Sequence, residues 1–224
     1  MTDHRCRFLQ LALQVQALRF GEFTLKSGRS SPYFFNAGRF DSGSALLGLA
    51  ECYADALDAA LDIGVLEPFD LLFGPAYKGI PLATALACEY ARRGRDLPVA
   101  FNRKEAKTHG EGGSLIGASL AGRRVLVVDD VITAGTAIRE ALSIITGAGA
   151  SVAGIVIALD RQEAFDPAAS RRSAAQTVTD EHAIPVVAVA TLNDLLAMAG
   201  ADETLAPQQE RLLAYRAAYG STGA

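Results

Sequence analysis

Apolar residues near the start of the chain recur at intervals of three or four, which places them on one face of a helix. The members of this face are Phe8, Leu11, Ala12, Val15 and Leu18. The next stretch, 20–38, mixes β-forming residues with glycine, serine and proline, which predicts short strands and turns. Helical spacing returns over 43–61, with Leu46, Leu49, Tyr53, Leu57 and Leu61 on the buried face.

From residue 70 onward, short apolar runs alternate with helical patterns. The runs lie at 70–76, 98–101, 125–128, 152–159 and 185–190. Uninterrupted apolar strands separated by helices indicate an α/β fold with a parallel sheet buried on both faces. We expect the run at 98–101 to end in a charged loop, 162–182 to form a loop and one helix, and 207–219 to form a terminal helix.

Composition narrows the class of protein. Half of the 224 residues are hydrophobic, which suits one globular domain spanning 1–224. The net charge of −4 gives no basic surface for nucleic acid, and no apolar run approaches the roughly 20 residues of a membrane span. The three cysteines are far apart and lack metal-site spacing, so we expect reduced thiols in a cytoplasmic protein.

Two adjacent acids, Asp129 and Asp130, directly follow the apolar run at 125–128, and the turn 132–136 (ITAGT) leads into a helix. Ligands bind at the carboxyl ends of parallel strands, and the amides of a helix N-terminus favour an anion. Gly135 permits close backbone approach, and the neighbouring threonines add hydroxyl groups. We therefore predict a phosphate cradle beside carboxylates that accept sugar hydroxyls or help hold a cation. The alternative is an ordinary loop with a capped helix.

The segment VVDDVITAGTA (127–137) resembles the ribose-phosphate signature of the type I phosphoribosyltransferases. Further segments resemble, in the same order, those of the orotate phosphoribosyltransferase family: 25–38, 73–83, 101–113 and 159–163. Residues 164–183 match no such segment. The resemblance implies a central, mostly parallel sheet flanked by helices, with a small hood formed by about residues 1–40.

This resemblance also implies a reaction. Orotate and phosphoribosyl pyrophosphate (PRPP) would give orotidine 5′-monophosphate and pyrophosphate through an oxocarbenium-like transition state. Such chemistry needs a charge clamp for the leaving pyrophosphate, a cradle for the ribose phosphate and a site that holds a planar anionic base in line. Mg²⁺ is implied as a bridge between pyrophosphate and ribose hydroxyls, held mainly by the substrate rather than by an all-protein metal site.

The resemblance assigns the ribose hydroxyls of PRPP to Asp129 and Asp130, with Asp130 also a candidate for proton transfer. The 5′-phosphate would lie against the turn formed by Val131, Ile132, Thr133, Ala134, Gly135, Thr136 and Ala137. Tyr77 and Lys78 would hold pyrophosphate through their backbone amides, and Lys26 would reach the phosphates. Taken alone, Lys78 fits an exposed helix start and Lys26 a solvated turn.

The charged loop 103–113 carries the remaining cations expected at the pyrophosphate: Arg103, Lys104, Lys107 and His109. In the family it is a mobile loop that closes over the site and reaches the pyrophosphate of a neighbouring subunit, which implies a homodimer. Lys104, Lys107, His109 and Asp130 are accordingly the catalytic candidates. The same run of charges, without the other motifs, is typical of a solvated surface hairpin.

The residues implied in orotate binding are Phe34, Phe35, Thr133 and Arg161. A guanidinium such as that of Arg161 suits a planar carboxylate. Paired phenylalanines more often pack in a core, and Arg161 has alternative partners in Asp160 and Glu163.

Two other functions share the acidic motif. A purine phosphoribosyltransferase would have no use for an arginine that recognises a carboxylate. A regulator that binds PRPP without turnover should carry a basic DNA-binding face, which the negative net charge and the mostly apolar, glutamine-rich first helix do not favour.

Overall fold

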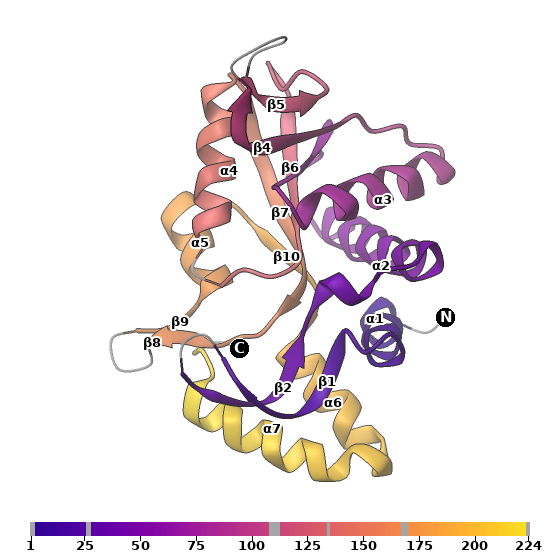
Figure 1. Ribbon diagram of the computed structural model, residues 1–224, viewed down its shortest axis with the longest axis vertical. Helices are drawn as coiled ribbons and strands as arrows, with labels where there is room; N and C mark the ends of the chain where they lie inside the picture. The colour runs from indigo at the N-terminus through magenta and orange to yellow at the C-terminus, as the bar shows by residue number, and fades with distance from the viewer. Residues whose placement is uncertain (1–2, 26–27, 108–112, 134, 167–169, 223–224) are drawn as a thin grey trace.

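The structure is a computed structural model that describes residues 3–25, 28–107, 113–133, 135–166 and 170–222. Its centre is a six-stranded sheet with helices on both faces (Figure 1). In order across the sheet, the strands are β10 (Val186–Thr191), β7 (Ser151–Asp160), β6 (Arg124–Asp129), β3 (Leu71–Gly74), β4 (Val99–Lys107) and β5 (Gly113–Gly117). Every neighbouring pair is parallel except β4 and β5. The predicted mostly parallel sheet is confirmed.

Helices cover the two faces of this sheet unequally (Figure 1). One face carries α2 (Gly43–Asp62) and α3 (Gly79–Arg92), with α1 (His4–Gln14) packed on α2. The other face carries α4 (Thr136–Gly147) and α5 (Ala174–His182). The core is therefore divided into two layers by the sheet, as expected for strands that are apolar on both sides.

Strand β6 shows how this division fixes the strand. Leu126 and Val128 face the layer under α2 and α3, whereas Val125 and Val127 face the layer under α4. All four side chains are fully buried. Because side chains alternate along a strand, a slip of one residue would exchange the two sets. Burial on both faces thus fixes where β6 ends and where the acids that follow it lie.

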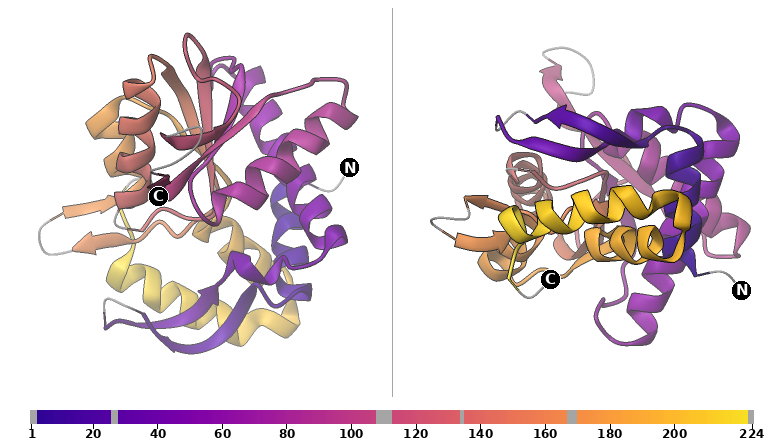
Figure 2. Two further views of the ribbon diagram at one scale, coloured as in Figure 1. Left: turned by 45° about the horizontal axis from the view of Figure 1, so that its top comes forward. Right: turned by 90° about the horizontal axis from the view of Figure 1, so that it is seen from below.

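A hairpin and the last two helices lie beside the carboxyl ends of the strands. The hairpin pairs β1 (Leu18–Thr24) with β2 (Ser30–Phe35), and it is followed by the short helix η1 (Ala37–Arg39). After β10 come α6 (Leu192–Ala201), η2 (Glu203–Leu205) and α7 (Ala206–Tyr219). Figure 2 shows α7 running beside the hairpin, where Tyr33 of β2 meets Tyr215 of α7 edge to face at 6.2 Å between ring centroids.

Several predicted boundaries were wrong. Helix α1 ends at Gln14, and Gln16, at a φ of 58°, turns the chain so that Leu18 begins β1 instead of extending the helix. The strand predicted at 98–101 continues to Lys107 and pairs with β5 as a hairpin. Within the segment predicted as a loop and one helix, β8 (Ala164–Asp166) and β9 (Ser170–Ser173) form a second hairpin before α5.

Gly79 begins α3 in a place that leaves no room for a side chain. A Cβ there would lie 2.6 Å from the carbonyl oxygen of Val128 and 2.6 Å from Cδ of Pro75. We expect Gly79→Ala to lower the free energy of unfolding by about 1–3 kcal/mol, as other overpacking substitutions do.

Urea denaturation of the two proteins measures this difference. Gly147→Ala is the matched control, because a Cβ at Gly147, in the last turn of α4, meets no atom within 4 Å. Equal losses of stability in both variants would contradict the argument.

Candidate active site

Asp129 and Asp130 lie at the carboxyl end of β6, and both side chains are buried. The backbone amide of Asp130 donates to Oδ1 of Asp129 at 2.9 Å. The hydroxyl of Tyr53, from α2, donates to the carbonyl oxygen of Asp129 at 2.8 Å. The carbonyl oxygen of Asp130 accepts from the amide of Ala158 in β7 at 2.9 Å. Hydrogen bonds from α2 and from β7 therefore hold the backbone of Asp129 and Asp130.

The two acids differ in their electrostatic environment. Burial, and next the charge of Asp130, raise the pKa of Asp129 to about 7. Asp130 instead has a cation beside it, since Nζ of Lys78 donates to its Oδ2 at 2.6 Å. Near neutral pH Asp129 is therefore partly protonated, whereas Asp130 is paired with Lys78.

The turn after the acids opens toward the N-terminus of α4. Gly135 adopts a left-handed conformation, with φ of 70°, and no side chain among the described residues caps the helix. Val131 and Ile132 are half-buried and pack into opposite layers of the core. The exposed members are Thr133, Thr136 and Ala137, while Ala134 lies outside the described residues. The turn thus presents backbone amides and hydroxyl groups above an apolar base.

A second turn, at the carboxyl end of β3, carries Tyr77 and Lys78. Its Ala76–Tyr77 peptide bond is cis, and the Tyr77 side chain is 65% exposed. The amide of Ala76 donates to Oδ1 of Asn102, a buried residue of β4, at 2.8 Å. Lys78 leaves this turn toward Asp130, so the turns after β3 and β6 meet through an ion pair.

The cations that the sequence predicted at the pyrophosphate belong to the segment 103–113, which begins in β4, the strand next to β3. Arg103 is half-buried, and Lys104 is exposed with Nζ 4.9 Å from the ring centroid of Tyr77 in the same chain. For Lys107 only the backbone is described, as the last residue of β4. His109 lies outside the described residues. Of the expected cations, the structure thus brings Lys104 beside the turn that carries Tyr77.

Arg161 follows the carboxyl end of β7, the strand next to β6. Of the two partners that the sequence left open, it pairs with Glu163: Nε and Nη2 donate to Oε1 of Glu163 at 2.9 and 2.7 Å. Asp160 instead accepts the amide of Gln162 at 2.8 Å. The pair is largely buried, in contrast to the surface ion pair that the sequence suggested, and its guanidinium lies 4.8 Å from the ring centroid of Tyr33.

The two phenylalanines of β2 point to opposite sides. Phe35 is buried in the core, where its ring centroid lies 6.0 Å from that of Phe8. Phe34 is half-buried and packs against Phe23 at 5.4 Å between centroids. The side chain of Phe35 therefore has the structural role that paired phenylalanines usually have, and only Phe34 has a side chain outside the core. Lys26 lies outside the described residues.

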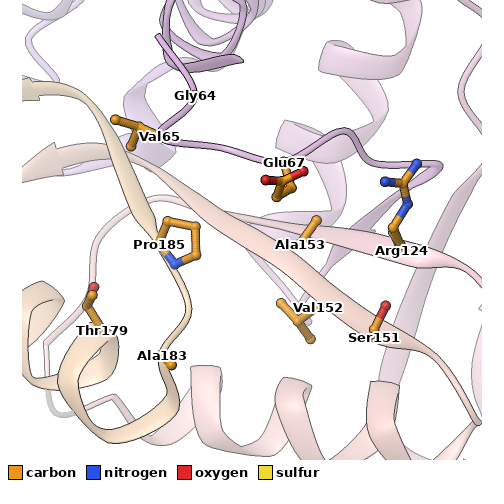
Figure 3. Close-up of a pocket in the computed structure, with 10 residues that line it drawn as sticks. All are labelled: Gly64, Val65, Glu67, Arg124, Ser151, Val152, Ala153, Thr179, Ala183 and Pro185. Carbon is orange, nitrogen blue, oxygen red and sulfur yellow. The ribbon is translucent and has the colours of Figure 1, made fainter. Parts of the chain in front are cut away.

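These turns all lie at the carboxyl ends of the strands, because β3, β4, β6 and β7 are parallel. A cavity of about 520 Å³ lies at the amino ends of the strands, lined by the residues that begin β6 and β7 together with Gly64, Glu67 and Pro185 (Figure 3). The candidate site is thus an open surface between turns rather than this cavity. Within the described ranges, no three His, Cys, Asp or Glu side chains gather as a metal site of their own.

Three residues that our sequence interpretation did not assign to the site hold its members in place by hydrogen bonds. Asn102 holds the amide of Ala76, Tyr53 holds the carbonyl of Asp129, and Glu163 holds Arg161. Tyr53 was expected on the buried face of its helix, but its hydroxyl gave no signal of a partner. Asn102 directly precedes Arg103 in one of the resembling segments, which is the only hint of its position.

Comparison with known proteins gives consistent matches. Residues 65–186 match the phosphoribosyl transferase domain family. Orotate phosphoribosyltransferase of Xanthomonas euvesicatoria is 72% identical over 99% of this chain and 98% of its own length, and that of Stenotrophomonas maltophilia strain K279a is 67% identical over 98% of each chain. The crystal structure of orotate phosphoribosyltransferase from Francisella tularensis is 41% identical, with a TM-score of 0.81 over 96% of this chain and 99% of that one.

The raised pKa of Asp129 predicts a pH dependence of stability. The folded protein keeps a proton that the unfolded chain loses above about pH 4, so stability falls as the pH rises from about 4 to about 7. Asp129→Asn removes the buried charge and keeps an acceptor for the amide of Asp130. At about 1.4 kcal/mol per pKa unit, we expect the ligand-free variant to be up to roughly 4 kcal/mol more stable above about pH 8 and to match the parent near pH 4.

Denaturation across this pH range measures the difference. Asp70→Asn is the control, because hydrogen bonds from Arg124 lower the pKa of the exposed Asp70 carboxyl. Replacing Asp70 by asparagine should make the protein less stable at high pH than the parent, or leave its stability unchanged. A difference between Asp129→Asn and the parent that stays constant with pH would refute the assignment.

Proposed function

The chain belongs to the orotate phosphoribosyltransferases within the phosphoribosyl transferase family, and from this premise we propose which of its residues carry out the reaction. The reaction transfers the 5-phosphoribosyl group of PRPP to N1 of orotate, gives orotidine 5′-monophosphate and pyrophosphate, and serves pyrimidine biosynthesis. The observation that carries the residue assignment is the meeting of Lys78, Asp129 and Asp130 at adjacent strand ends, beside the uncapped turn that begins α4.

PRPP lies across these turns in our proposal. Carboxylates of Asp129 and Asp130 accept hydrogen bonds from the ribose hydroxyls, and the amides of 131–137 bind the 5′-phosphate at the helix N-terminus. Ribose binding requires Asp129 as the ionised acceptor, whereas burial favours its protonated form. A cation held near the pair would supply charge that favours the ionised form. Asp130 is also the candidate for proton transfer.

Pyrophosphate lies between the turn that carries Tyr77 and Lys78 and the cations of the 103–113 loop. Lys78, now paired with Asp130, exchanges this carboxylate for a phosphate oxygen when PRPP binds. The remaining cations of the proposal are Lys26, Arg103, Lys104, Lys107 and His109. Closure of the loop brings charge to the leaving group and excludes water, which strengthens each electrostatic contact.

Orotate lies on the side of Arg161 and the β1–β2 hairpin. The guanidinium of Arg161 pairs with the orotate carboxylate, Thr133 contacts the ring from the opposite side, and Phe34 with the backbone of Phe35 forms a wall. A purine base has no carboxylate for Arg161, and the negative net charge does not favour a DNA-binding regulator. The names of the relatives agree with the orotate enzyme over both alternatives.

The residues at the strand ends suit Mg²⁺. Mg²⁺ favours one or two carboxylates together with substrate phosphates, and Asp129 and Asp130 offer two adjacent carboxyl groups with no third acid gathered beside them among the described residues. When bound, the ion would neutralise charge on the leaving pyrophosphate. Asp129 and Asp130 would hold it together with the substrate.

We further propose a homodimer in which the 103–113 loop reaches the site of the other subunit, and a cytoplasmic location. The hairpin supports this because β4 and β5 form the edge of the sheet, where a loop can extend beyond its own subunit (Figure 1). Among the described residues, none of the helices combines the length and apolar character needed to cross a bilayer.

Base selectivity tests the function directly. With Mg²⁺ and PRPP, we expect turnover of orotate, measured by the loss of orotate absorbance. We expect no turnover of adenine, hypoxanthine or uracil. Arg161→Ala should raise the KM for orotate about tenfold or more and leave the KM for PRPP near that of the parent, because only the base loses a charged partner. Turnover of another base in place of orotate would keep the PRPP cradle and overturn the base site.

Lys104→Ala should lower kcat far more than it raises the KM for PRPP, because its charge acts as pyrophosphate departs. Arg124→Ala, which removes a cation at the amino end of β6, is the control and should keep the parental kcat.

Mixing Lys104→Ala with Asp130→Asn tests the shared loop. A mixed dimer would contain one intact site, so random re-association should restore about a quarter of the parental activity. No recovery would place Lys104 in the site of its own chain, beside its own Tyr77.

A further inference from the structure

Arg161 is held by the carboxylate of Glu163, to which the proposed reaction assigns no contact with either substrate. Its side chain is 17% exposed, and that of Glu163 is 13% exposed. A single oxygen of Glu163, Oε1, accepts from both Nε and Nη2 of the guanidinium. Two charged hydrogen bonds to one acceptor fix the plane of the guanidinium as well as its position.

The β1–β2 hairpin holds the same oxygen from another direction. The hydroxyl of Tyr33, a fully buried residue of β2, donates to Oε1 of Glu163 at 3.1 Å. Its ring supports the guanidinium of Arg161 at 4.8 Å. Glu163 therefore receives three donors, and Arg161 is confined by an ion pair on one edge and an aromatic ring beside it.

The backbone at Glu163 is fixed by the C-terminal segment. Glu163 forms a β-bridge with Gly220, and the carbonyl of Gln162 accepts the amide of Ser221 at 2.8 Å. Gln162 adopts a left-handed conformation, with φ of 50°, which turns the chain so that Glu163 faces back toward Arg161. The backbone of Glu163 is thus held in place by the fold, and its carboxylate lacks the rotational freedom of a surface acid.

The pairing leaves a defined part of the guanidinium for a ligand. Glu163 occupies Nε and one hydrogen of Nη2, and the nearest other partner of Nη2 is the hydroxyl of Ser31 at 3.4 Å. Nη1 makes no hydrogen bond to any of the described residues. The Nη1–Nη2 edge can therefore receive a planar carboxylate while the opposite edge stays anchored.

We propose that Glu163 is a positioning residue for the base site, which holds the guanidinium of Arg161 so that its Nη1–Nη2 edge faces the carboxylate of orotate. This inference rests on the proposed role of Arg161. Glu163 contacts no substrate and acts only through Arg161. Its effect should accordingly appear in orotate binding, and it should disappear when Arg161 is absent.

A double-mutant cycle tests this with Glu163→Ala, Arg161→Ala and the double variant, by steady-state kinetics in both substrates. We expect Glu163→Ala to raise the KM for orotate about tenfold, with the KM for PRPP unchanged, since a buried charge-assisted pair is lost. Glu163→Gln keeps an acceptor and the shape of the side chain, and it should recover most of this loss. In the Arg161→Ala background, Glu163→Ala should have no further effect.

Asp180→Asn is the matched control, because it also removes the carboxylate partner of an arginine, Arg172, but at an exposed position on α5. It should leave both KM values unchanged. Thermal unfolding of each variant shows that the chain remains folded.

The outcomes separate the two claims. If Arg161→Ala raises the KM for orotate and Glu163→Ala does not, the positioning role is overturned and the base site stands. If neither variant changes the KM for orotate, both are overturned. Additive effects in the double variant, or equal losses for orotate and PRPP, would make Glu163 a purely structural residue and overturn the inference.

Discussion

The ion pair between Lys78 and Asp130 is the contact on which the site depends, because it joins the turns after two neighbouring strands. Without this cation, two adjacent buried carboxyl groups would repel each other at neutral pH, and burial together with the charge of Asp130 already raises the pKa of Asp129 to about 7. The folded state tolerates the acids because one is neutralised by Lys78 and the other holds a proton for part of the time. In the proposed function, a substrate that carries hydroxyl groups and phosphates would change both conditions at once.

In the proposed site, phosphate recognition and base recognition are assigned to different strands. Lys78, Asp129 and Asp130, which we propose bind the phosphates and the ribose hydroxyls, lie in the turns after β3 and β6, whereas Arg161 follows β7, beside the β1–β2 hairpin and α7. Each group is backed by a residue from another element: Asn102 for the turn after β3, Tyr53 for Asp129, and Glu163 for Arg161. Such support restricts side-chain motion at the reacting groups, which is what in-line transfer requires.

The sequence predicted the part of the fold that burial dictates. The strand 125–128 was recognisable because apolar residues fill both faces, and its end therefore located Asp129 and Asp130. The β8–β9 hairpin was not recognisable, because β8 and β9 are only three and four residues long and β9 is polar. Its backbone is also held by a distant partner, since the amide of Thr222 donates to the carbonyl of Arg171. The choice of Glu163 over Asp160 likewise depends on the backbone turn at Gln162, which residue types do not reveal.

We propose that ligand binding at the strand end ionises Asp129. The most direct measurement is the number of protons released when Mg²⁺ and PRPP bind, by titration calorimetry at pH 7 in buffers of different ionisation enthalpy. PRPP itself contributes equally in the parent and in Asp129→Asn, so their difference isolates the acid. The account predicts that the parent releases about half a proton more than the variant, because a group with a pKa of about 7 is half protonated at that pH. Equal release by both proteins, with PRPP bound, would contradict it.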